Sequence, residues 1–214
     1  MRKLPLQKLV AVSAVASALP SYAVVLVQYD FASSLAPSTV DSNVTASDVG
    51  QSDLPNMSVV GGQLSVPASD IAVTTAVATT DYIQFTVTPN APLLVNLASL
   101  TFDIGRVFTG GYTAGYAVFS SVDSYGASIG SGSLTGASGT LTGISLDLSG
   151  PAYQGLSSIT FRIGLSDGNN GANNSIRVDN LTLNGAVVPE PHEYAAMAGL
   201  GLLGFAVWRR ARRA

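Results

Sequence analysis

Apolar and polar residues alternate in several stretches of the middle of the chain, and clusters of Gly, Ser, Asn and Asp separate these stretches. Alternation with a period of two indicates a strand with one buried face, and the separating residues favour turns. No segment there shows the 3.6-residue period of an amphipathic helix. The pattern predicts strands over residues 24–31, 71–79, 82–88, 93–104 (one strand or two), 112–122, 140–148, 158–165 and 175–183.

Two parts of this region have no clear strand pattern. Residues 32–51 are rich in Ser, Thr and Asp, so we expect a long loop or a short helical turn. Residues 124–143 are rich in Gly and Ser, so we expect a hairpin with exposed loops; a flexible linker is the alternative. About eight to ten short strands at this spacing predict an all-β fold, a β-sandwich or jelly roll, in one domain over residues 24–187.

The first 23 residues have the parts of a secretory signal peptide. Arg2, Lys3 and Lys8 form a basic start, and residues 9–19 form an apolar run that suits a signal helix. A small-x-small sequence ends at Ala23, so we expect signal peptidase to cleave after Ala23. The alternative is an uncleaved anchor, although the apolar run is short for a membrane span.

The last 27 residues, 188–214, combine a proline motif, an apolar stretch and a basic end. The prolines end the preceding strand and make a stiff spacer. Residues 195–208 carry no charge and predict a short transmembrane helix, with Tyr194 and Trp208 as interfacial anchors. The positive-inside rule places the arginines on the cytoplasmic side. The residues of the motif and the basic end are Pro189, Glu190, Pro191, Arg209, Arg210, Arg212 and Arg213.

This tail resembles the PEP-CTERM sorting signal, which has the same three parts in the same order at the chain end. The resemblance implies a Gram-negative host that makes exopolysaccharide and an exosortase-type processing enzyme as partner. It also implies a transient tether to the inner membrane, cleavage near the Pro-Glu-Pro motif, and delivery to the cell surface or extracellular matrix. The alternative is a plain C-terminal membrane anchor, which needs no Pro-Glu-Pro element.

The body between the two ends is acidic and lacks many reactive residues. Three arginines against eleven aspartates give residues 24–187 a net charge of −8, and the chain has no cysteine. This charge excludes nucleic acid as a partner, because phosphate recognition needs cations. The only histidine, His192, lies in the tail, so the body has neither a Ser-His-Asp triad nor His or Cys ligands for zinc.

The body is also similar to the domains that commonly precede such tails, and its last strand is similar to that of carbohydrate-binding jelly-roll modules. The segments that carry this resemblance are residues 29–31, 158–163 and 177–185. In such modules the first and last strands often pair and share a structural calcium, which implies a calcium site at Asp30 and Asp179. The alternative is that Asp179 makes a hydrogen bond or a salt bridge, with Arg177 or Arg162.

Calcium takes oxygen ligands, so the loop over residues 167–174, which is rich in Asp and Asn, is a second candidate for this ion. The loop lacks the terminal Glu and the alternating acids of an EF-hand. A Gly/Asn turn between two strands is therefore the simpler interpretation.

Three functions are compatible with this sequence. The leading interpretation is a non-enzymatic structural or adhesive protein of the cell surface or matrix. The first alternative is a carbohydrate-binding module for host exopolysaccharide, which would gather two or more tyrosines beside Asn or Asp on one face. The second is a glycoside hydrolase with two aspartate carboxyls about 5–10 Å apart in a cleft. The candidate tyrosines are Tyr112, Tyr116, Tyr125 and Tyr153.

Overall fold

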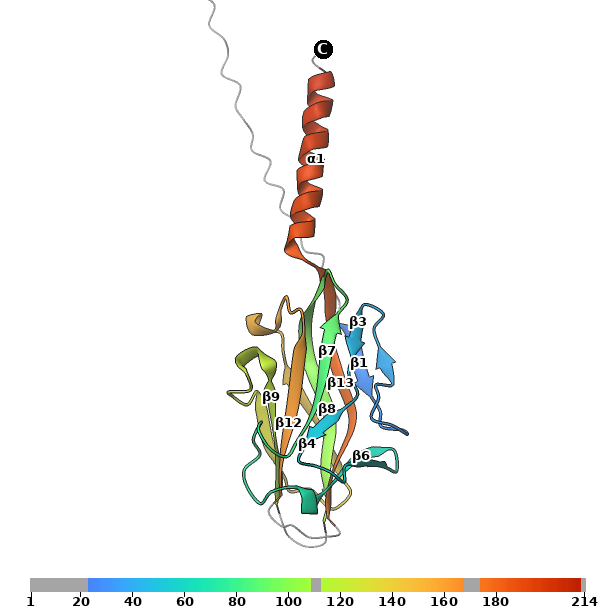
Figure 1. Ribbon diagram of the computed structural model, residues 1–214, viewed down its shortest axis with the longest axis vertical. Coiled ribbons are helices and arrows are strands. Elements are labelled where there is room, and N and C mark those ends of the chain that lie inside the picture. Colours follow the sequence, from blue (N-terminus) through green and yellow to red (C-terminus); the bar gives the residue numbers. More distant parts are fainter. Residues whose placement is uncertain (1–22, 109–112, 168–173, 213–214) are drawn as a thin grey trace, which may run out of the picture.

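The computed structural model describes residues 23–108, 113–167 and 174–212. For residues 191–198 it describes the backbone only. Strands dominate this part of the chain and form two antiparallel sheets that face each other (Figure 1). One α-helix, α1 (Pro191–Ala211), follows them within the described residues. The all-β prediction is confirmed.

The first sheet is built around its longest strands, β13 (Ser175–Pro189) and β8 (Leu93–Val107), which pair from Ser175↔Val107 to Pro189↔Leu93. On its other side β13 pairs with β1 (Val24–Tyr29) toward its end and with β6 (Gln63–Pro67) toward its start. The remaining strands are β11 (Leu141–Asp147) beside β8, β2 (Thr39–Val40) beside β1, and β5 (Ser58–Val60) beside β6.

The second sheet has β9 (Ala114–Ser120) and β12 (Ile159–Asp167) at its centre, and β10 (Gly130–Leu134) forms one edge. The other side of β12 pairs with β7 (Tyr82–Pro89). Two short strands, β3 (Val44–Ala46) and β4 (Gly50–Ser52), pair with β7. Three 3-10 turns complete the body: η1 (Ala68–Asp70), η2 (Ser121–Asp123) and η3 (Pro151–Tyr153).

A row of aromatic rings crosses the core between the sheets. The Phe85 ring centroid lies 5.4 Å from that of Tyr29 and 5.6 Å from that of Phe161. The Tyr29 hydroxyl donates a 2.6 Å hydrogen bond to the Ser47 carbonyl, which satisfies its polar end. Burial, reinforced by the charge of Asp48, raises the pKa of Tyr29, so this phenol stays protonated. Such rings join β1 to β7 and β12, and they hold the sheets together.

Most predicted strands are confirmed, but three segments differ. Residues 71–79 form no strand; they cross the outer face of the second sheet as a loop between η1 and β7. Residues 32–51 contain β2, β3 and the start of β4 rather than only a loop or helical turn. Residues 124–143 do not form a hairpin of their own: β10 pairs back with β9, and β11, which begins at Leu141, pairs with β8 in the other sheet.

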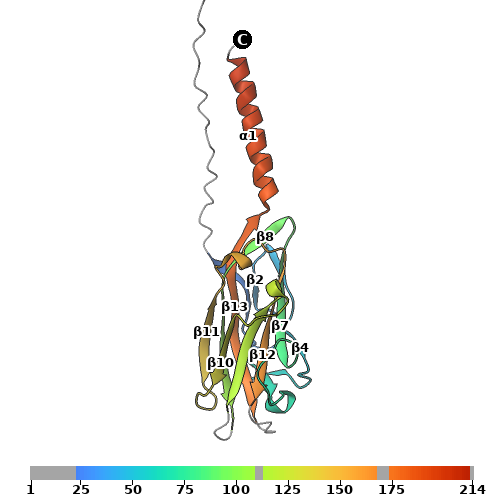
Figure 2. The same ribbon diagram turned by 90° about the vertical axis from the view of Figure 1, so that its left-hand side faces the viewer.

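The C-terminal tail begins without a spacer. Strand β13 continues to Pro189, Glu190 follows, and Pro191 opens α1, which projects away from the sandwich (Figures 1 and 2). The predicted C-terminal helix is therefore confirmed as a helix. Its use as a membrane span is not confirmed, since no helix in the described ranges is both long and apolar enough to cross a bilayer. The predicted signal helix lies outside the described residues.

Candidate functional site

A hollow of about 550 Å³ lies on the outer face of the second sheet. β12 ends and β13 begins near it, and β13 ends at α1, so the hollow lies at the end of the sandwich far from α1 (Figure 1). We call it the hydroxyl hollow. Its lining residues come from three strands and the 71–81 loop: Val73, Thr74, Thr75, Ala76, Thr113, Gly115, Tyr116, Ala117, Ser131, Gly132, Ser133, Ser166 and Asp167.

Small residues make the floor of the hydroxyl hollow. Gly115 lies opposite Ser133 in β10 and opposite Ser166 in β12. A Cβ atom on Gly115 would lie 2.8 Å from the Ser166 hydroxyl oxygen, so even an alanine there would displace this serine. Ala117 is the next floor residue along β9. The absence of bulk at these positions leaves the depression open.

The 71–81 loop forms one wall. It crosses β12 at Gly164, where a Cβ atom would overlap with the Val77 carbonyl. Ala76 and Ala78 pack on Ala117 and Phe119 as a small apolar cluster outside the main core. This loop lies against the sheet because both partners are small where they touch.

Two polar interactions fix the same loop. The Asp81 carboxylate accepts a 2.7 Å hydrogen bond from the Ala72 N–H, which closes the base of the loop. The Arg162 Nη1 donates a 2.9 Å hydrogen bond to the Ala78 carbonyl. Arg162 is itself held, since its guanidinium carbon lies 4.3 Å from the Tyr82 ring centroid and 3.8 Å from the Tyr125 centroid. The wall is therefore positioned before any ligand arrives.

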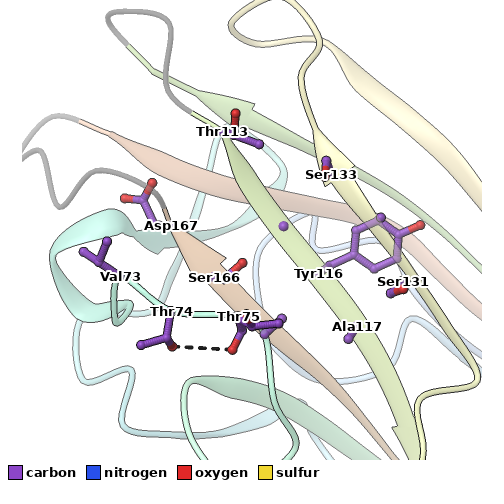
Figure 3. A pocket seen from close by; sticks show the side chains of 13 residues that line it. Val73, Thr74, Thr75, Thr113, Tyr116, Ala117, Ser131, Ser133, Ser166 and Asp167 are labelled. Atoms are coloured by element: carbon purple, nitrogen blue, oxygen red, sulfur yellow. Dashed lines mark hydrogen bonds between the residues drawn. The ribbon is translucent and has the colours of Figure 1, made fainter.

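Apart from one carboxylate, the polar side chains that line the hydroxyl hollow are uncharged, and they lie among small or apolar residues such as Val73, Ala76 and Ala117. Figure 3 shows Thr74 and Thr75 on one side, Ser131 and Ser133 on the other, and Ser166 between them. Hydroxyl groups both donate and accept hydrogen bonds, and a carboxylate accepts them. Asp167, 1% exposed, is the only carboxylate of the lining. This set of groups matches a neutral polyol. A glycosidase uses a pair of carboxyl groups, and the described residues contribute one to this lining.

The three candidate tyrosines that the structure describes do not form a platform together. Tyr116 points into the core, where its ring meets that of Phe102 edge-on at 5.8 Å, and burial raises its pKa. Tyr125 stacks on Arg162, and the Tyr153 hydroxyl shares a 3.3 Å hydrogen bond with that of Ser120. Tyr112 lies outside the described residues. A row of aromatic rings therefore does not mark this site.

The two tentative calcium ligands lie on the outer face of the first sheet. Asp179 is opposite Asp103 across β13 and β8. Burial, together with the charges of Asp103 and Asp30, raises the pKa of Asp179. Among the described residues, no group of three or more carboxylate, imidazole or thiolate side chains is arranged to hold a metal ion. The calcium site stays a prediction.

The alternative role predicted for Asp179 is a hydrogen bond or salt bridge, and the structure shows a hydrogen bond with the adjacent residue. Its carboxylate accepts a 2.8 Å hydrogen bond from the Asn180 N–H. The expected arginine partners bond elsewhere: Arg177 to the Ser175 hydroxyl and the Val60 carbonyl, and Arg162 to Ala78 and Gln84. Most of the loop proposed as a second calcium candidate lies outside the described residues.

The sorting-motif residues lie at both ends of α1. Pro189 is the last residue of β13 and pairs with Leu93, and Pro191 is the first residue of the helix. Arg209 and Arg210 occupy the last helical turn, and the Arg212 guanidinium lies 4.2 Å from the Trp208 ring centroid. Arg213 lies outside the described residues. Ala23 is exposed, immediately before β1.

No protein-family model and no curated protein matches this chain. Solved structures that resemble it include the mannan-recognising carbohydrate-binding module TmCBM27, with 14% identity, 77% of this chain and 98% of that chain covered, and a TM-score of 0.41. The K3 cleaved adhesin domain of Lys-gingipain from Porphyromonas gingivalis W83 is 14% identical, with 75% of this chain and 99% of that chain covered and a TM-score of 0.42. The CBM22-1 xylan-binding domain of Paenibacillus barcinonensis Xyn10C is 12% identical, with 78% of this chain and 97% of that chain covered and a TM-score of 0.39. These values are too low to transfer a ligand or an activity to this chain.

Proposed function

We propose that this protein is an exported, non-enzymatic component of the cell surface or extracellular matrix that binds neutral units of a polysaccharide in the hydroxyl hollow. The observation that carries the proposal is the composition of that hollow, which gathers uncharged hydroxyl groups from β10, β12, Thr113 and the 71–81 loop, with a single buried carboxylate at one edge (Figure 3). In this proposal the protein fulfils its structural role by adhering to polysaccharide.

The volume and the polar groups of the hollow support a small sugar segment as ligand. About 550 Å³ falls within the range of small-molecule sites. The serine and threonine hydroxyls can donate hydrogen bonds to sugar hydroxyls and accept hydrogen bonds from them, and Asp167 lies buried at one edge of the hollow. The floor of Gly115 and Ala117 lets a ring approach the backbone closely. Because none of the described residues places an aromatic ring over this floor, we expect weak binding at each site, with a Kd in the range of about 0.1–1 mM.

Weak single sites suit a protein displayed in many copies, since several sites on one polymer raise the overall avidity. The hollow lies at the end of the sandwich opposite α1 (Figure 1). Attachment through the tail would therefore leave the hollow facing outward. Export by the N-terminal signal and sorting by an exosortase-type enzyme belong to the same proposal.

Affinity electrophoresis of the purified protein in gels containing soluble neutral polysaccharides tests the binding. Ser131 is exposed and lines only the hydroxyl hollow, so Ser131→Trp should fill it without disturbing the core. Ser145→Trp is the matched control, because Ser145 is an exposed strand serine on the edge of the other sheet. We expect retardation by at least one neutral polysaccharide that S131W loses about tenfold and S145W retains. Equal retardation of the two variants, or none of the wild-type protein across a panel of neutral polymers, would contradict the proposal.

A further inference from the structure

A second hollow, of about 300 Å³, lies between the edges of the two sheets. β10 is the edge of the second sheet and β11 is the edge of the first, and the two lie next to each other on one side of the sandwich (Figure 2). We call this space the edge hollow. Tyr116, Gly132 and Ser133 line both hollows, so the two spaces meet at β10.

The edge hollow has a charge unlike that of the body. Its lining includes one cation, Arg106, and no aspartate, although the body holds eleven aspartates and three arginines. The other lining groups of the edge hollow that can hydrogen-bond through side chains are the Tyr116 phenol and the hydroxyls of Ser133, Thr135, Thr140 and Thr142.

Arg106 is anchored but its hydrogen-bonding capacity is not used up. Its Nε donates a 3.1 Å hydrogen bond to the Gly136 carbonyl, and its guanidinium carbon lies 5.5 Å from the Phe108 ring centroid. The Nη1 atom is buried and has no hydrogen-bond partner among the described residues. A buried charged donor without an acceptor costs free energy, and an oxyanion in the hollow would remove that cost.

The other two body arginines are in a different state. Arg162 is held between two tyrosines and donates to Ala78 and Gln84. Arg177 donates to the Ser175 hydroxyl and the Val60 carbonyl. Neither contributes to the lining of either hollow. Arg106 is thus the body cation placed to meet a ligand.

We propose that the edge hollow binds the carboxylate of an acidic sugar unit through Arg106. A planar guanidinium pairs with a carboxylate through two parallel hydrogen bonds, and the surrounding hydroxyls match the rest of a sugar ring. This inference deepens the proposed function: a glycan that crosses β10 places a neutral unit in the hydroxyl hollow and a uronate unit in the edge hollow. The ligand class is then a polysaccharide with acidic units among neutral ones.

The charge of the body limits how acidic that polymer can be. A net charge of −8 over residues 24–187 repels a polyanion at long range. One carboxylate beside Arg106 gains a local partner, whereas further carboxylates gain none and are repelled by the net charge of the body. The edge hollow therefore favours isolated uronate units over a dense polyuronate. Added salt weakens the attraction of a carboxylate to Arg106, but it also screens the repulsion between a dense polyuronate and the body. Salt should therefore weaken binding of the dense polymer less than binding of a glycan with isolated uronate units.

Saturation-transfer NMR with the full-length protein and free methyl glucuronoside tests the edge hollow separately from neutral-glycan binding. Arg106→Gln should reduce the binding of the uronate at least tenfold, and Arg177→Gln is the matched control that should leave it unchanged. The uncharged methyl ester and acetate should each bind at least tenfold more weakly than the uronate. Arg106→Lys keeps the charge but loses the two parallel hydrogen bonds of the guanidinium, so we expect its uronate binding to be intermediate. This variant also tests the proposal if R106Q does not fold.

The two proposals fail in different ways. R106Q should keep its retardation by neutral polysaccharide, and S131W should keep its binding of the free uronate. Uronate binding that is equal in wild type, R106Q and R106K, or absent in the wild type, would overturn the edge-hollow proposal alone. Acetate bound as tightly as the uronate would overturn the assignment to a sugar. Loss of neutral-polysaccharide binding in the wild type would overturn the proposed function alone.

Discussion

The guanidinium of Arg162 stacks on the ring of Tyr125, with 3.8 Å between its carbon and the ring centroid. Arg162 belongs to β12, and Tyr125 follows η2 with φ at 63°, a backbone state that non-glycine residues adopt at some cost. The same guanidinium reaches the Ala78 carbonyl in the 71–81 loop. One side chain therefore connects the sheet, the turn after η2, and the wall of the hydroxyl hollow.

Replacing this arginine should loosen the wall. We expect Arg162→Gln to lower the free energy of unfolding by about 1–3 kcal/mol, because it removes two cation–π contacts and a hydrogen bond to a carbonyl. Affinity for neutral polysaccharide should fall as well. Urea denaturation and affinity electrophoresis measure the two effects.

The ring of Tyr125 supplies the control for that change. Tyr125→Phe keeps the stacking surface and should behave as the wild type, whereas Tyr125→Ala should move in the direction of R162Q. If R162Q lost stability but kept its full affinity, the arginine would have no positioning role at the hollow.

Gly164 lies where the 71–81 loop crosses the sheet, and it should tolerate no larger residue. Gly164→Ala places a methyl group against the Val77 carbonyl, a backbone atom that cannot rotate away. We expect a loss of about 1–3 kcal/mol in the free energy of unfolding, as for other overpacked sites. Gly150→Ala is the matched control, since Gly150 has a φ of −63° and no atom within 4 Å of the added methyl. Equal urea midpoints for the two variants would show that the loop is not held against β12.

The position of Asp179 opposite Asp103 predicts a dependence of stability on pH. The pKa of Asp179 is raised above 3.8 in the folded chain, so the ionised form destabilises the fold at neutral pH. As pH falls through the raised pKa toward 3.8, the folded state takes up the proton first and this destabilisation disappears. Asp179→Asn should raise the free energy of unfolding at pH 7 by about 0.2–1 kcal/mol, the usual size of a cross-strand charge effect. Thermal unfolding at pH 7 and near pH 4 should show the gain at the higher pH only; the same gain at both would refute the charge explanation.

In the presence of bound calcium, Asp179→Asn should lower the stability of the protein instead of raising it. If Asp30 and Asp179 hold the ion, millimolar calcium should raise the melting temperature of the wild type by several degrees, and D179N should lose this response. Magnesium at the same concentration is the control, because its smaller octahedral shell suits such a site less well. A melting temperature that is insensitive to both calcium and chelator would remove the calcium prediction.

The sequence predicts much of the fold because burial alternates along the long strands. In β7, for example, Ile83, Phe85 and Val87 are buried while Gln84 and Thr86 are not, which is the pattern that alternation encodes. Residues 71–79 mislead for the same reason. They are apolar and β-branched, but they pack on small residues at Gly164 and Ala117 rather than joining a sheet. The polar segment 32–51 errs in the opposite direction, because its short strands bury few side chains.

The site was beyond the reach of sequence patterns. Gly115, Ser131 and Ser166 come from three strands, and no spacing along the chain relates them. Serine, threonine and glycine also serve as turn and surface residues, so their types carry no signal on their own. Arg106 gave a weak signal as one of three body arginines. Its meaning depends on an unpaired Nη1 between two sheet edges, which only the three-dimensional arrangement reveals.

The tail makes a prediction that separates sorting from simple attachment. If an exosortase-type enzyme processes the protein, intact-mass analysis of surface or matrix fractions should find a form that begins at Val24 and ends near Pro189. Deletion of the exosortase should leave the longer form with Trp208 in the inner membrane. If the tail is inserted as predicted, the positive-inside rule assigns these arginines to the cytoplasmic end. Neutral residues in place of Arg209, Arg210, Arg212 and Arg213 should then disturb topology or processing.

The structure adds a mechanical constraint to this prediction. Pro189, the last residue of β13, pairs with Leu93 of β8, so the predicted cleavage region lies within one or two residues of the sheet. A processing enzyme must therefore act on the short stretch around Glu190, or the last pairs of β13 must open first. Leu94 pairs with Val188 next to this end of β13. Leu94→Pro removes a backbone N–H from the pairing, so it should speed tail removal if opening limits the rate and leave it unchanged if cleavage falls at or beyond Glu190. A full-length form that stays in the inner membrane, whether or not the exosortase is present, would instead identify an ordinary anchored protein and remove the matrix location from the proposed function.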